Sequence, residues 1–243
     1  MAVDKSDNRV RQMFGAIAPA YDRMNHLLSL GVDRYWRWRT ARIVRPEGQE
    51  PILDVCTGTG DLALAFARRT AGAVPIYATD FCPEMLELGR AKSRQAAHGR
   101  KLTFLEADTQ ALPFTADTFQ IVSVAFGLRN VADTDQGLRE MTRVCQRAGR
   151  VAILEFSMPC RQPMRALYGW YFRRALPRIG QLLARNDYQA YRYLPESVGE
   201  FPERAHLVRR MESVGLSDVR CFSFTGGVAT LYVGTKGTVT PRT

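Results

Sequence analysis

Ile52-Leu53-Asp54-Val55-Cys56-Thr57-Gly58-Thr59-Gly60-Asp61-Leu62-Ala63 is the stretch of sequence that decides the fold. Its first four residues are apolar apart from one acid, which is typical of a buried parallel strand. Two glycines follow, and the apolar periodicity from Leu62 to Arg69 predicts a helix. Because glycine has no Cβ, the turn can be sharp and its backbone can approach a ligand closely. A strand, a glycine turn and a helix in this order open a nucleotide-binding α/β unit.

An acid further along the chain narrows the class of ligand. A second apolar stretch ends at Asp80, and 80 − 60 = 20 residues separate Gly60 from this acid. At about this spacing a carboxylate accepts hydrogen bonds from ribose hydroxyls. The two glycines alone would fit a tight turn of any α/β protein, and the third glycine of the dinucleotide fingerprint is missing. The pattern therefore favours a ligand with a ribose but no phosphate, such as S-adenosylmethionine.

The length and composition predict one globular domain spanning residues 1–243, with a sizeable core because 46% of the residues are hydrophobic. No apolar run approaches the roughly 18 residues of a membrane helix, and residues 1–7 have no apolar signal-peptide core. We therefore expect a cytoplasmic protein. The five cysteines are scattered without a Cys-x-x-Cys pair and the three histidines lie far apart, so we expect no metal.

The formal net charge of +10 suggests an anionic partner. Three interpretations fit this positive charge: contact with an anionic membrane surface at the inner face of the membrane, binding to nucleic acid, and a surface whose arginines are simply solvated. The sequence has no recognisable nucleic-acid-binding motif, so we expect no nucleic acid. Peripheral membrane contact and an oligomeric state both remain open.

Further elements complete an α/β pattern. Strands are predicted at Leu102–Glu106, Phe119–Phe126 and Arg150–Phe156, and a closing hairpin at Val219–Phe224 and Val228–Val233. Helices are predicted between them, including Glu84–Ala97, Thr134–Gln146 and Phe201–Ser213. We therefore predict an α/β fold: a Rossmann-like three-layer α/β/α sandwich with a seven-stranded sheet whose last strand is antiparallel.

Two segments lie outside this alternation. Residues 1–45 are predicted to form an N-terminal helical extension, with a helix at Val10–Ile17 that ends before Pro19 and another that begins with Asp33 as its N-cap. Residues 161–196 are rich in aromatic and basic residues and are predicted to form a helical lid insertion, interrupted at Pro177. Both segments can fold over the ligand edge of the sheet.

Polar residues follow the ends of the predicted strands, where doubly wound sheets bind their ligands. Asp108 stands just past the third strand and can accept from an adenine amino group, or it is simply a turn residue. Arg129 and Asn130 follow the fourth strand and suit the mouth of an active site. Alternatively, they lie in a surface loop whose arginine pairs with a stray acid. Glu155 falls within the fifth strand, where an acid is costly without a partner.

Stretches along most of the chain resemble the class I S-adenosylmethionine-dependent methyltransferases, and more narrowly the ubiquinone/menaquinone biosynthesis C-methyltransferase family. The matching stretches are Tyr21-Asp22-Arg23-Met24-Asn25, Gly58-Thr59-Gly60-Asp61, Phe126-Gly127-Leu128-Arg129-Asn130-Val131, Leu154-Glu155-Phe156-Ser157 and Tyr191-Arg192-Tyr193-Leu194-Pro195-Glu196-Ser197. The chain departs from the family pattern at Asp33, where histidine is usual.

The resemblance implies an S-adenosylmethionine-dependent C-methyltransferase that acts on a polyprenylated hydroquinone. We favour conversion of demethylmenaquinol to menaquinol, with methylation of the polyprenyl-methoxy-benzoquinol ubiquinone precursor as the alternative. The predicted cofactor-binding residues are Asp54, Gly58, Thr59, Gly60, Asp80, Asp108, Thr109 and Ala125. Tyr21, Asn25 and Tyr193 are predicted to bind the substrate, and Arg129 and Asn130 to act in catalysis.

The predicted mechanism aligns the activated methyl group with a ring carbon of the acceptor. The carbon becomes nucleophilic as the hydroquinol hydroxyl loses its proton, and Arg129 and Asn130 would stabilise and hydrogen-bond the phenolate. Arginine stays protonated, so electrostatic stabilisation is favoured over a literal base. The rival hypotheses are a methyltransferase for another small molecule, an RNA-modifying protein and a non-catalytic scaffold.

Overall fold

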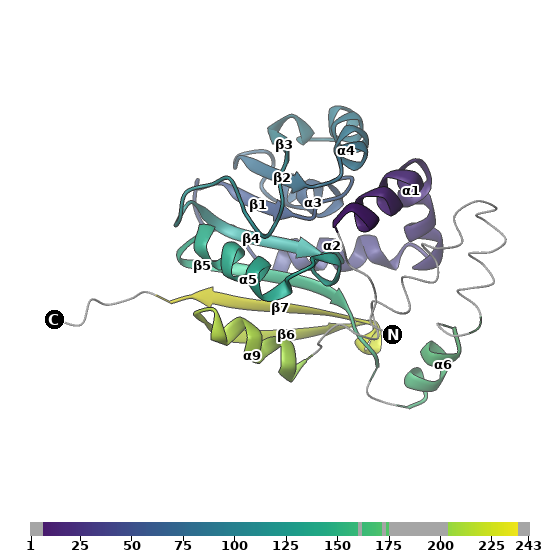
Figure 1. Ribbon diagram of the computed structural model, residues 1–243. Coiled ribbons are helices and arrows are strands. Elements are labelled where there is room, and N and C mark those ends of the chain that lie inside the picture. The colour runs from purple at the N-terminus through teal and green to yellow at the C-terminus, as the bar shows by residue number, and fades with distance from the viewer. Residues whose placement is uncertain (1–6, 160–161, 172–173, 175–203, 238–243) are drawn as a thin grey trace.

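A single mixed sheet organises the chain in the computed structural model, which describes residues 7–159, 162–171, 174 and 204–237 (Figure 1). The strand order is β3-β2-β1-β4-β5-β7-β6. The first five strands pair in parallel, and β7 is antiparallel to both of its neighbours. The bounds are β1 Ile52–Val55, β2 Ile76–Asp80, β3 Leu102–Glu106, β4 Phe119–Ala125, β5 Cys145–Phe156, β6 Leu216–Phe224 and β7 Ala229–Lys236. The predicted seven-stranded sheet with an antiparallel last strand is confirmed.

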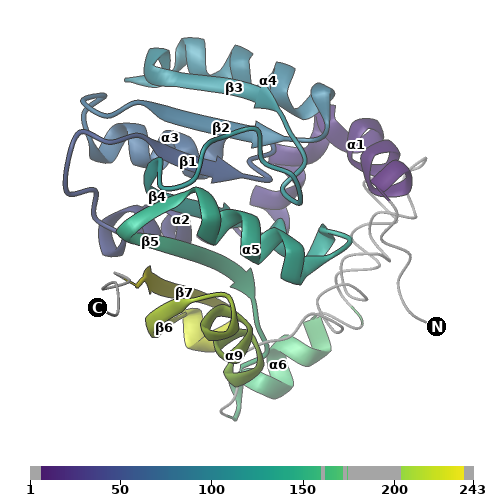
Figure 2. The same cartoon turned by 60° about the vertical axis from the view of Figure 1, so that its left-hand side comes forward.

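Helices cover both faces of this sheet (Figure 2). One face carries α2 (Val32–Ile43), α3 (Asp61–Arg69) and α4 (Pro83–Gln95), while α5 (Thr134–Val144) and α9 (Ala205–Ser213) cover the other. Short 3-10 turns occupy η1 (Gly99–Lys101), η2 (Leu128–Asn130) and η4 (Thr225–Gly227). The result is the predicted three-layer sandwich, because the apolar stripe of each helix must be buried against the sheet.

Two apolar clusters, one on each face, hold the layers together. Strands β1 and β4 lie in the centre and are buried along almost their whole length. On one face Phe66 of α3 is fully buried, and on the other Leu138 and Met141 of α5 pack at a spacing of three residues. The start of α5 is fixed by Asp133, whose carboxylate accepts from the backbone N–H of Gln136 at 2.9 Å.

The N-terminal helix α1 (Asp7–Leu28) runs through Pro19, so the predicted end of a helix before this proline is wrong. Proline removes one backbone donor but does not prevent packing. Phe14, Ala18 and Tyr21 of α1 pack against Cys82 and Met85 at the start of α4. This apolar contact outweighs the missing hydrogen bond, and it holds α1 over the carboxyl ends of the parallel strands.

The second helix of the extension begins two residues earlier than predicted, at Val32. Its N-cap is Gly31 with φ of +75°, a left-handed conformation that glycine adopts without strain. Asp33 is therefore not the cap but a buried residue of the first turn. Its carboxylate accepts from His26 Nδ1 at 2.9 Å, from Ser29 Oγ at 2.7 Å and from the Arg37 guanidinium. Three donors explain why burial of this acid is tolerated.

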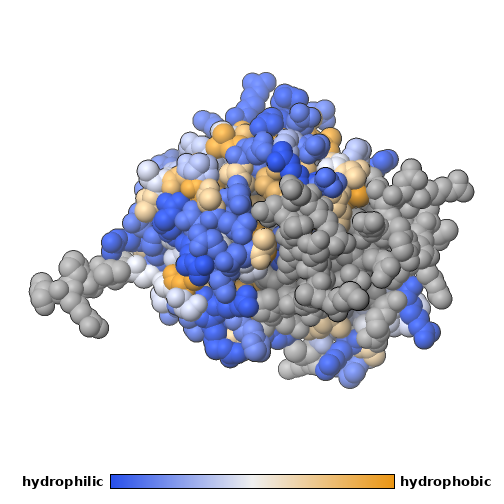
Figure 3. Space-filling view, viewed as in Figure 1, coloured by the Kyte–Doolittle hydropathy of each residue, from blue (hydrophilic) through white to orange (hydrophobic). Residues whose placement is uncertain are grey.

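Only part of the predicted lid lies within the described residues. Helix α6 (Met164–Trp170) belongs to it, and the partly buried Tyr168 packs against the core cluster beneath. The remainder of 161–196, including Pro177 and Tyr193, lies outside the described residues. On the face shown in Figure 3 the described surface is mainly hydrophilic, with hydrophobic residues in small separate groups. No described helix has the length and hydrophobicity needed to cross a membrane.

Candidate active site

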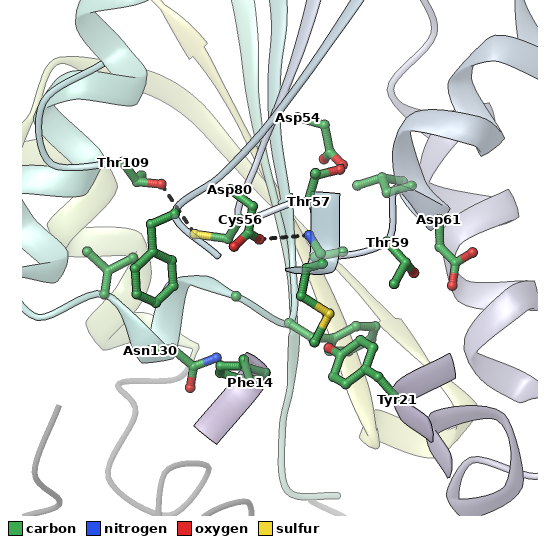
Figure 4. Close-up of a pocket in the computed structure, with 18 of the residues that line it drawn as sticks. Phe14, Tyr21, Asp54, Cys56, Thr57, Thr59, Asp61, Asp80, Thr109 and Asn130 are labelled. Atoms are coloured by element: carbon green, nitrogen blue, oxygen red, sulfur yellow. Dashed lines mark hydrogen bonds between the residues drawn. The ribbon is translucent and has the colours of Figure 1, made fainter. Parts of the chain in front are cut away.

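A cavity opens where the strand order reverses between β1 and β4, the position at which open α/β sheets bind their ligands. Its open space, including the mouth, is about 820 Å³. The ends of β1, β2 and β4 form its floor, and Phe14 and Tyr21 of α1 lie across it (Figure 4). The cavity therefore combines residues that lie far apart in the sequence.

The glycine loop and Asp80 form the centre of the cavity. Asp80 ends β2, and its carboxylate accepts from the backbone N–H of Gly58 at 2.8 Å and of Cys82 at 3.0 Å. Gly58 and Gly60 both have positive φ, and a Cβ on Gly60 would lie 3.0 Å from the Phe104 ring. Burial raises the pKa of Asp80 to about 6. Each carboxylate oxygen keeps a further lone pair, so Asp80 can still accept from ribose hydroxyls.

Asp54 lies in β1 beneath the glycine loop and is buried. Its carboxylate accepts from the hydroxyl of Thr57 at 2.6 Å and from that of Ser123 at 2.7 Å. Burial raises its pKa to about 6, against the lowering effect of these two hydrogen bonds. Asp54 lines the cavity, so its negative charge faces a ligand.

The residues predicted to contact adenine follow the end of β3. Thr109 is buried and its hydroxyl lies 3.2 Å from Cys56 Sγ, while Asp108 lines the cavity and remains exposed. In Figure 4, Thr109 and Asp61 stand at opposite sides of the cavity with Asp80 between them. Ala125, at the end of β4, also lines the cavity. The predicted cofactor-binding residues are thus brought together by the strand ends.

A polar network ties α1 to the glycine loop. The hydroxyl of Thr59 donates to Asp22 at 2.6 Å, and the ammonium of Lys92 donates to Asp22 at 2.7 Å and to Thr59 at 3.2 Å. Lys92 also pairs with Asp61, the first residue of α3. One lysine of α4 therefore links the extension and the loop, so that α1 and the cavity floor keep a fixed spacing.

Arg37 is a cavity residue that the sequence analysis did not select. It is buried in α2, pairs with Asp33 and stacks over the Phe126 ring at 5.3 Å from the ring centroid. Burial disfavours its charge, but Asp61, Asp33 and Tyr21 together raise its pKa above the ordinary value. Its position depends on the packing of α2 against the sheet, and no local sequence motif predicts it.

Arg129 and Asn130 lie in the turn η2 after β4, but in different environments. The Arg129 guanidinium pairs with Glu155 at 2.7 Å, and its backbone N–H donates to the same carboxylate at 3.3 Å. Both side chains of the pair are buried, which supplies the partner that Glu155 requires. Among the described residues that line the cavity, Asn130 is present and Arg129 is not. Asn130 Oδ1 is buried and has no hydrogen-bond partner within the described part of the chain.

Of the predicted substrate residues, Tyr21 lines the cavity. Burial raises the pKa of its hydroxyl, although Arg129, Arg37 and a hydrogen bond with Asn25 lower it. The tyrosine is therefore neutral at ordinary pH and its hydroxyl can donate. Asn25 is not among the described lining residues and contacts Tyr21 instead.

The fold places this site in a class of proteins. A solved S-adenosylmethionine-dependent methyltransferase from Thermotoga maritima, described as a possible histamine N-methyltransferase, matches the structure with a TM-score of 0.64 at 15% identity. The match covers 93% of this chain and 99% of that one. The chain thus has the Rossmann-like fold of these methyltransferases, with acids from neighbouring strands around one cavity.

The sequence decides the family. The pattern of the ubiE/COQ5 methyltransferase family matches residues 2–236, and the chain belongs to this family. The "Ubiquinone/menaquinone biosynthesis C-methyltransferase UbiE" of Citrifermentans bemidjiense is 46% identical over 235 residues, 97% of this chain and 99% of the relative. The "Demethylmenaquinone methyltransferase" of Thermus thermophilus is 44% identical over 224 residues, 92% of this chain and 100% of the relative. The chain is therefore a methyltransferase, with S-adenosylmethionine as the implied methyl donor.

Proposed function

We propose that the chain transfers a methyl group from S-adenosylmethionine to a ring carbon of a polyprenylated hydroquinone, converting demethylmenaquinol to menaquinol. The observation that carries this proposal is the match over nearly its whole length to relatives named for this reaction. The cavity supports it, because its lining combines acids suited to the donor with apolar and aromatic groups suited to a ring.

The donor fits the acidic residues that line the cavity. S-adenosylmethionine carries an electrophilic methyl group on a sulfonium, and its ribose needs hydrogen-bond acceptors. Asp80 would accept from the ribose hydroxyls, and Asp108 with Thr109 would lie at the adenine. The glycine loop leaves room for the donor, because Gly58 lines the cavity without a side chain and adopts positive φ.

The acceptor ring would lie against apolar lining residues, among them Phe14, Phe126 and Val131. Asn130 Oδ1 would accept the hydrogen bond of the hydroquinol hydroxyl, which satisfies a buried acceptor that lacks a partner among the described residues. This contact orients the hydroxyl and increases electron density on the ring carbon that attacks the methyl group. The methyl–sulfur bond breaks as the new carbon–carbon bond forms, S-adenosylhomocysteine leaves, and solvent water takes up the proton that the ring then loses. Arg129 would then be a positioning residue, because its pairing with Glu155 holds the turn that presents Asn130.

The test is methyl transfer from labelled S-adenosylmethionine to demethylmenaquinol and to the polyprenyl-methoxy-benzoquinol precursor, measured side by side. We expect label in the naphthoquinol product and loss of turnover by about 100-fold in Asn130→Ala, with donor binding retained. Arg139→Ala, at an exposed position of α5, is the matched control. Wild-type turnover in Asn130→Ala would remove this residue from the mechanism.

A second acceptor is supported by a specific observation. The relative from Citrifermentans bemidjiense is named for both ubiquinone and menaquinone biosynthesis. Label in both products would mean that the ring pocket accepts benzoquinols as well as naphthoquinols. Label in neither product, with donor still bound, would redirect the search to other small molecules and to RNA.

We further propose that the enzyme contacts an anionic membrane surface through one face of α2. Tyr35 and Trp38 are 47% and 48% exposed on this helix, and Leu30 just before it is 86% exposed. The guanidinium of Arg42 lies over the Trp38 ring at 4.8 Å from the centroid. Aromatic rings beside arginines suit the interface of a bilayer that holds the polyprenyl substrate.

Sedimentation with vesicles of phosphatidylglycerol and of phosphatidylcholine tests this contact. We expect binding to the anionic vesicles and a loss of about tenfold or more in Arg42→Glu, since each basic residue near the surface contributes about 1 kcal/mol. Arg94→Glu, an exposed residue of α4, should bind as the wild type does. Equal weakening by both substitutions would indicate a general charge effect and not this surface.

A further inference from the structure

We propose that Arg37 binds the carboxylate of the methionyl part of the donor, so that the N-terminal extension completes the donor site. The proposal rests on S-adenosylmethionine being the donor. It concerns a residue of α2, outside the glycine loop and outside the strand ends that hold the ribose and adenine.

The charges of the cavity point to Arg37. Among the lining residues that the structure describes, it is the only lysine or arginine. Four aspartates line the same cavity: Asp54, Asp61, Asp80 and Asp108. The donor is a net cation with two positive groups, a sulfonium and an ammonium, and a single anionic group, its carboxylate. The charges of the cavity complement those of the donor: the aspartates suit its two positive groups, and Arg37 suits its carboxylate.

The direction of the donor brings its carboxylate to Arg37. The adenine side is at Thr109 and the ribose acceptor is Asp80, so the methionyl part extends to the side of Asp61 (Figure 4). Asp61, the first residue of α3, has a carboxylate oxygen within 4.8 Å of one of Asp33, and Asp33 pairs with Arg37. Arg37 therefore stands at the end of the cavity where the carboxylate arrives.

The guanidinium is also held ready for a second anion. Asp33 accepts from Nη1, and this is the one hydrogen bond of Arg37 found within the described part of the chain. The guanidinium carbon also lies over the Phe126 ring, 5.3 Å from its centroid, in a cation–π contact. A guanidinium has five N–H donors in a fixed fork, so donors remain for a carboxylate after Asp33 is satisfied. The pair with Asp33 orients the fork before the ligand binds.

The experiment removes the carboxylate from the ligand and, separately, the Arg37 guanidinium from the protein. Dissociation constants are measured by calorimetry for S-adenosylhomocysteine and for its decarboxylated analogue, which keeps the ammonium and the nucleoside. We expect the wild type to bind the decarboxylated analogue about 10- to 100-fold more weakly, because a charged hydrogen-bonded pair is lost. In Arg37→Met the two ligands should bind within about threefold of each other.

Arg39→Met is the matched control, because Arg39 belongs to the same helix but is exposed. It should keep the discrimination of the wild type, and Arg37→Lys should keep part of it because it keeps the charge. A wild type that binds both ligands equally well would overturn the proposal without any variant. So would a folded Arg37→Met that still discriminates as the wild type does. Failure of the wild type to bind either ligand would instead show that the donor site itself is wrongly assigned.

Discussion

The buried pair of Arg129 and Glu155 gives the sharpest test of how this site is built. The side chains are 7% and 2% exposed and their charged atoms lie 2.7 Å apart. Removal of one partner leaves a buried charge without compensation, which costs about 3–5 kcal/mol of unfolding free energy. We therefore expect Arg129→Met and Glu155→Leu each to lose about 3–5 kcal/mol. In a protein of this size that corresponds to a fall of roughly 6–20 °C in Tm.

The double variant Arg129→Met/Glu155→Leu should recover much of this loss, because two apolar side chains replace both charges. Urea unfolding followed by circular dichroism gives the three free energies, and the double-mutant cycle should show a coupling of about 2 kcal/mol or more. Single losses below about 1 kcal/mol, or losses that simply add, would refute the argument from burial.

Turnover of the folded double variant then separates two roles of Arg129. If turnover returns with stability, Arg129 acts by holding the turn before Asn130. If stability returns while turnover stays lost and donor binding survives, the contact with the acceptor that the sequence analysis predicted is supported. Donor binding is measured in parallel with S-adenosylhomocysteine, so that a damaged donor site is not mistaken for lost chemistry.

Three further outcomes are expected. Because the folded pKa of Asp54 is raised to about 6, its protonation stabilises the folded state, and that stability is lost as pH rises from about 4 to about 6. The variant Asp54→Asn has no charge at this position, and its two hydroxyl partners can adapt to the amide. Its unfolding free energy relative to that of the wild type should therefore increase over this pH range, by about 3 kcal/mol in total above pH 7. A difference that does not change with pH would contradict the raised pKa. Lys92→Met should weaken S-adenosylhomocysteine binding several-fold and expose α1 to protease, whereas exposed Arg94→Met should do neither. Gly60→Ala should cost more in thermal stability than Gly215→Ala, since both have positive φ but only the first Cβ meets a neighbouring ring.

Much of the cavity lining could be predicted from the sequence because its signals are local. A strand, a glycine turn and a helix are encoded within one short stretch, and Asp80 follows at a fixed spacing because one helix and one return strand separate them. The parallel strands then bring Asp80, Thr109 and Ala125 to the same edge. Resemblance to a family extended the prediction to the reaction, and the comparisons place the chain in the ubiE/COQ5 methyltransferase family.

Capping and helix ends were less predictable, because tertiary contacts outweigh local preferences. Pro19 does not end α1, since the helix gains an apolar contact with the start of α4. Asp33 has the residue type of an N-cap but is buried one position inside the helix, where His26, Ser29 and Arg37 satisfy it. The contact of α1 with α4 cannot be derived from neighbours in the sequence, whereas the partners of Asp33 are close to it in the sequence and are positioned by the turn between α1 and α2.

The sequence by itself therefore determined the fold class, the glycine loop, Asp80 and the succession of strands and helices along the chain, because each depends on local periodicity or fixed spacing. Only the tertiary structure decided that Asn130 faces the cavity while Arg129 turns to Glu155. It likewise decided that Arg37 lines the cavity from a helix that precedes the sheet. The orientations of these side chains depend on which charged groups pair in the protein interior, where the dielectric constant is low. Charged groups that are distant in sequence come together only after the layers have packed.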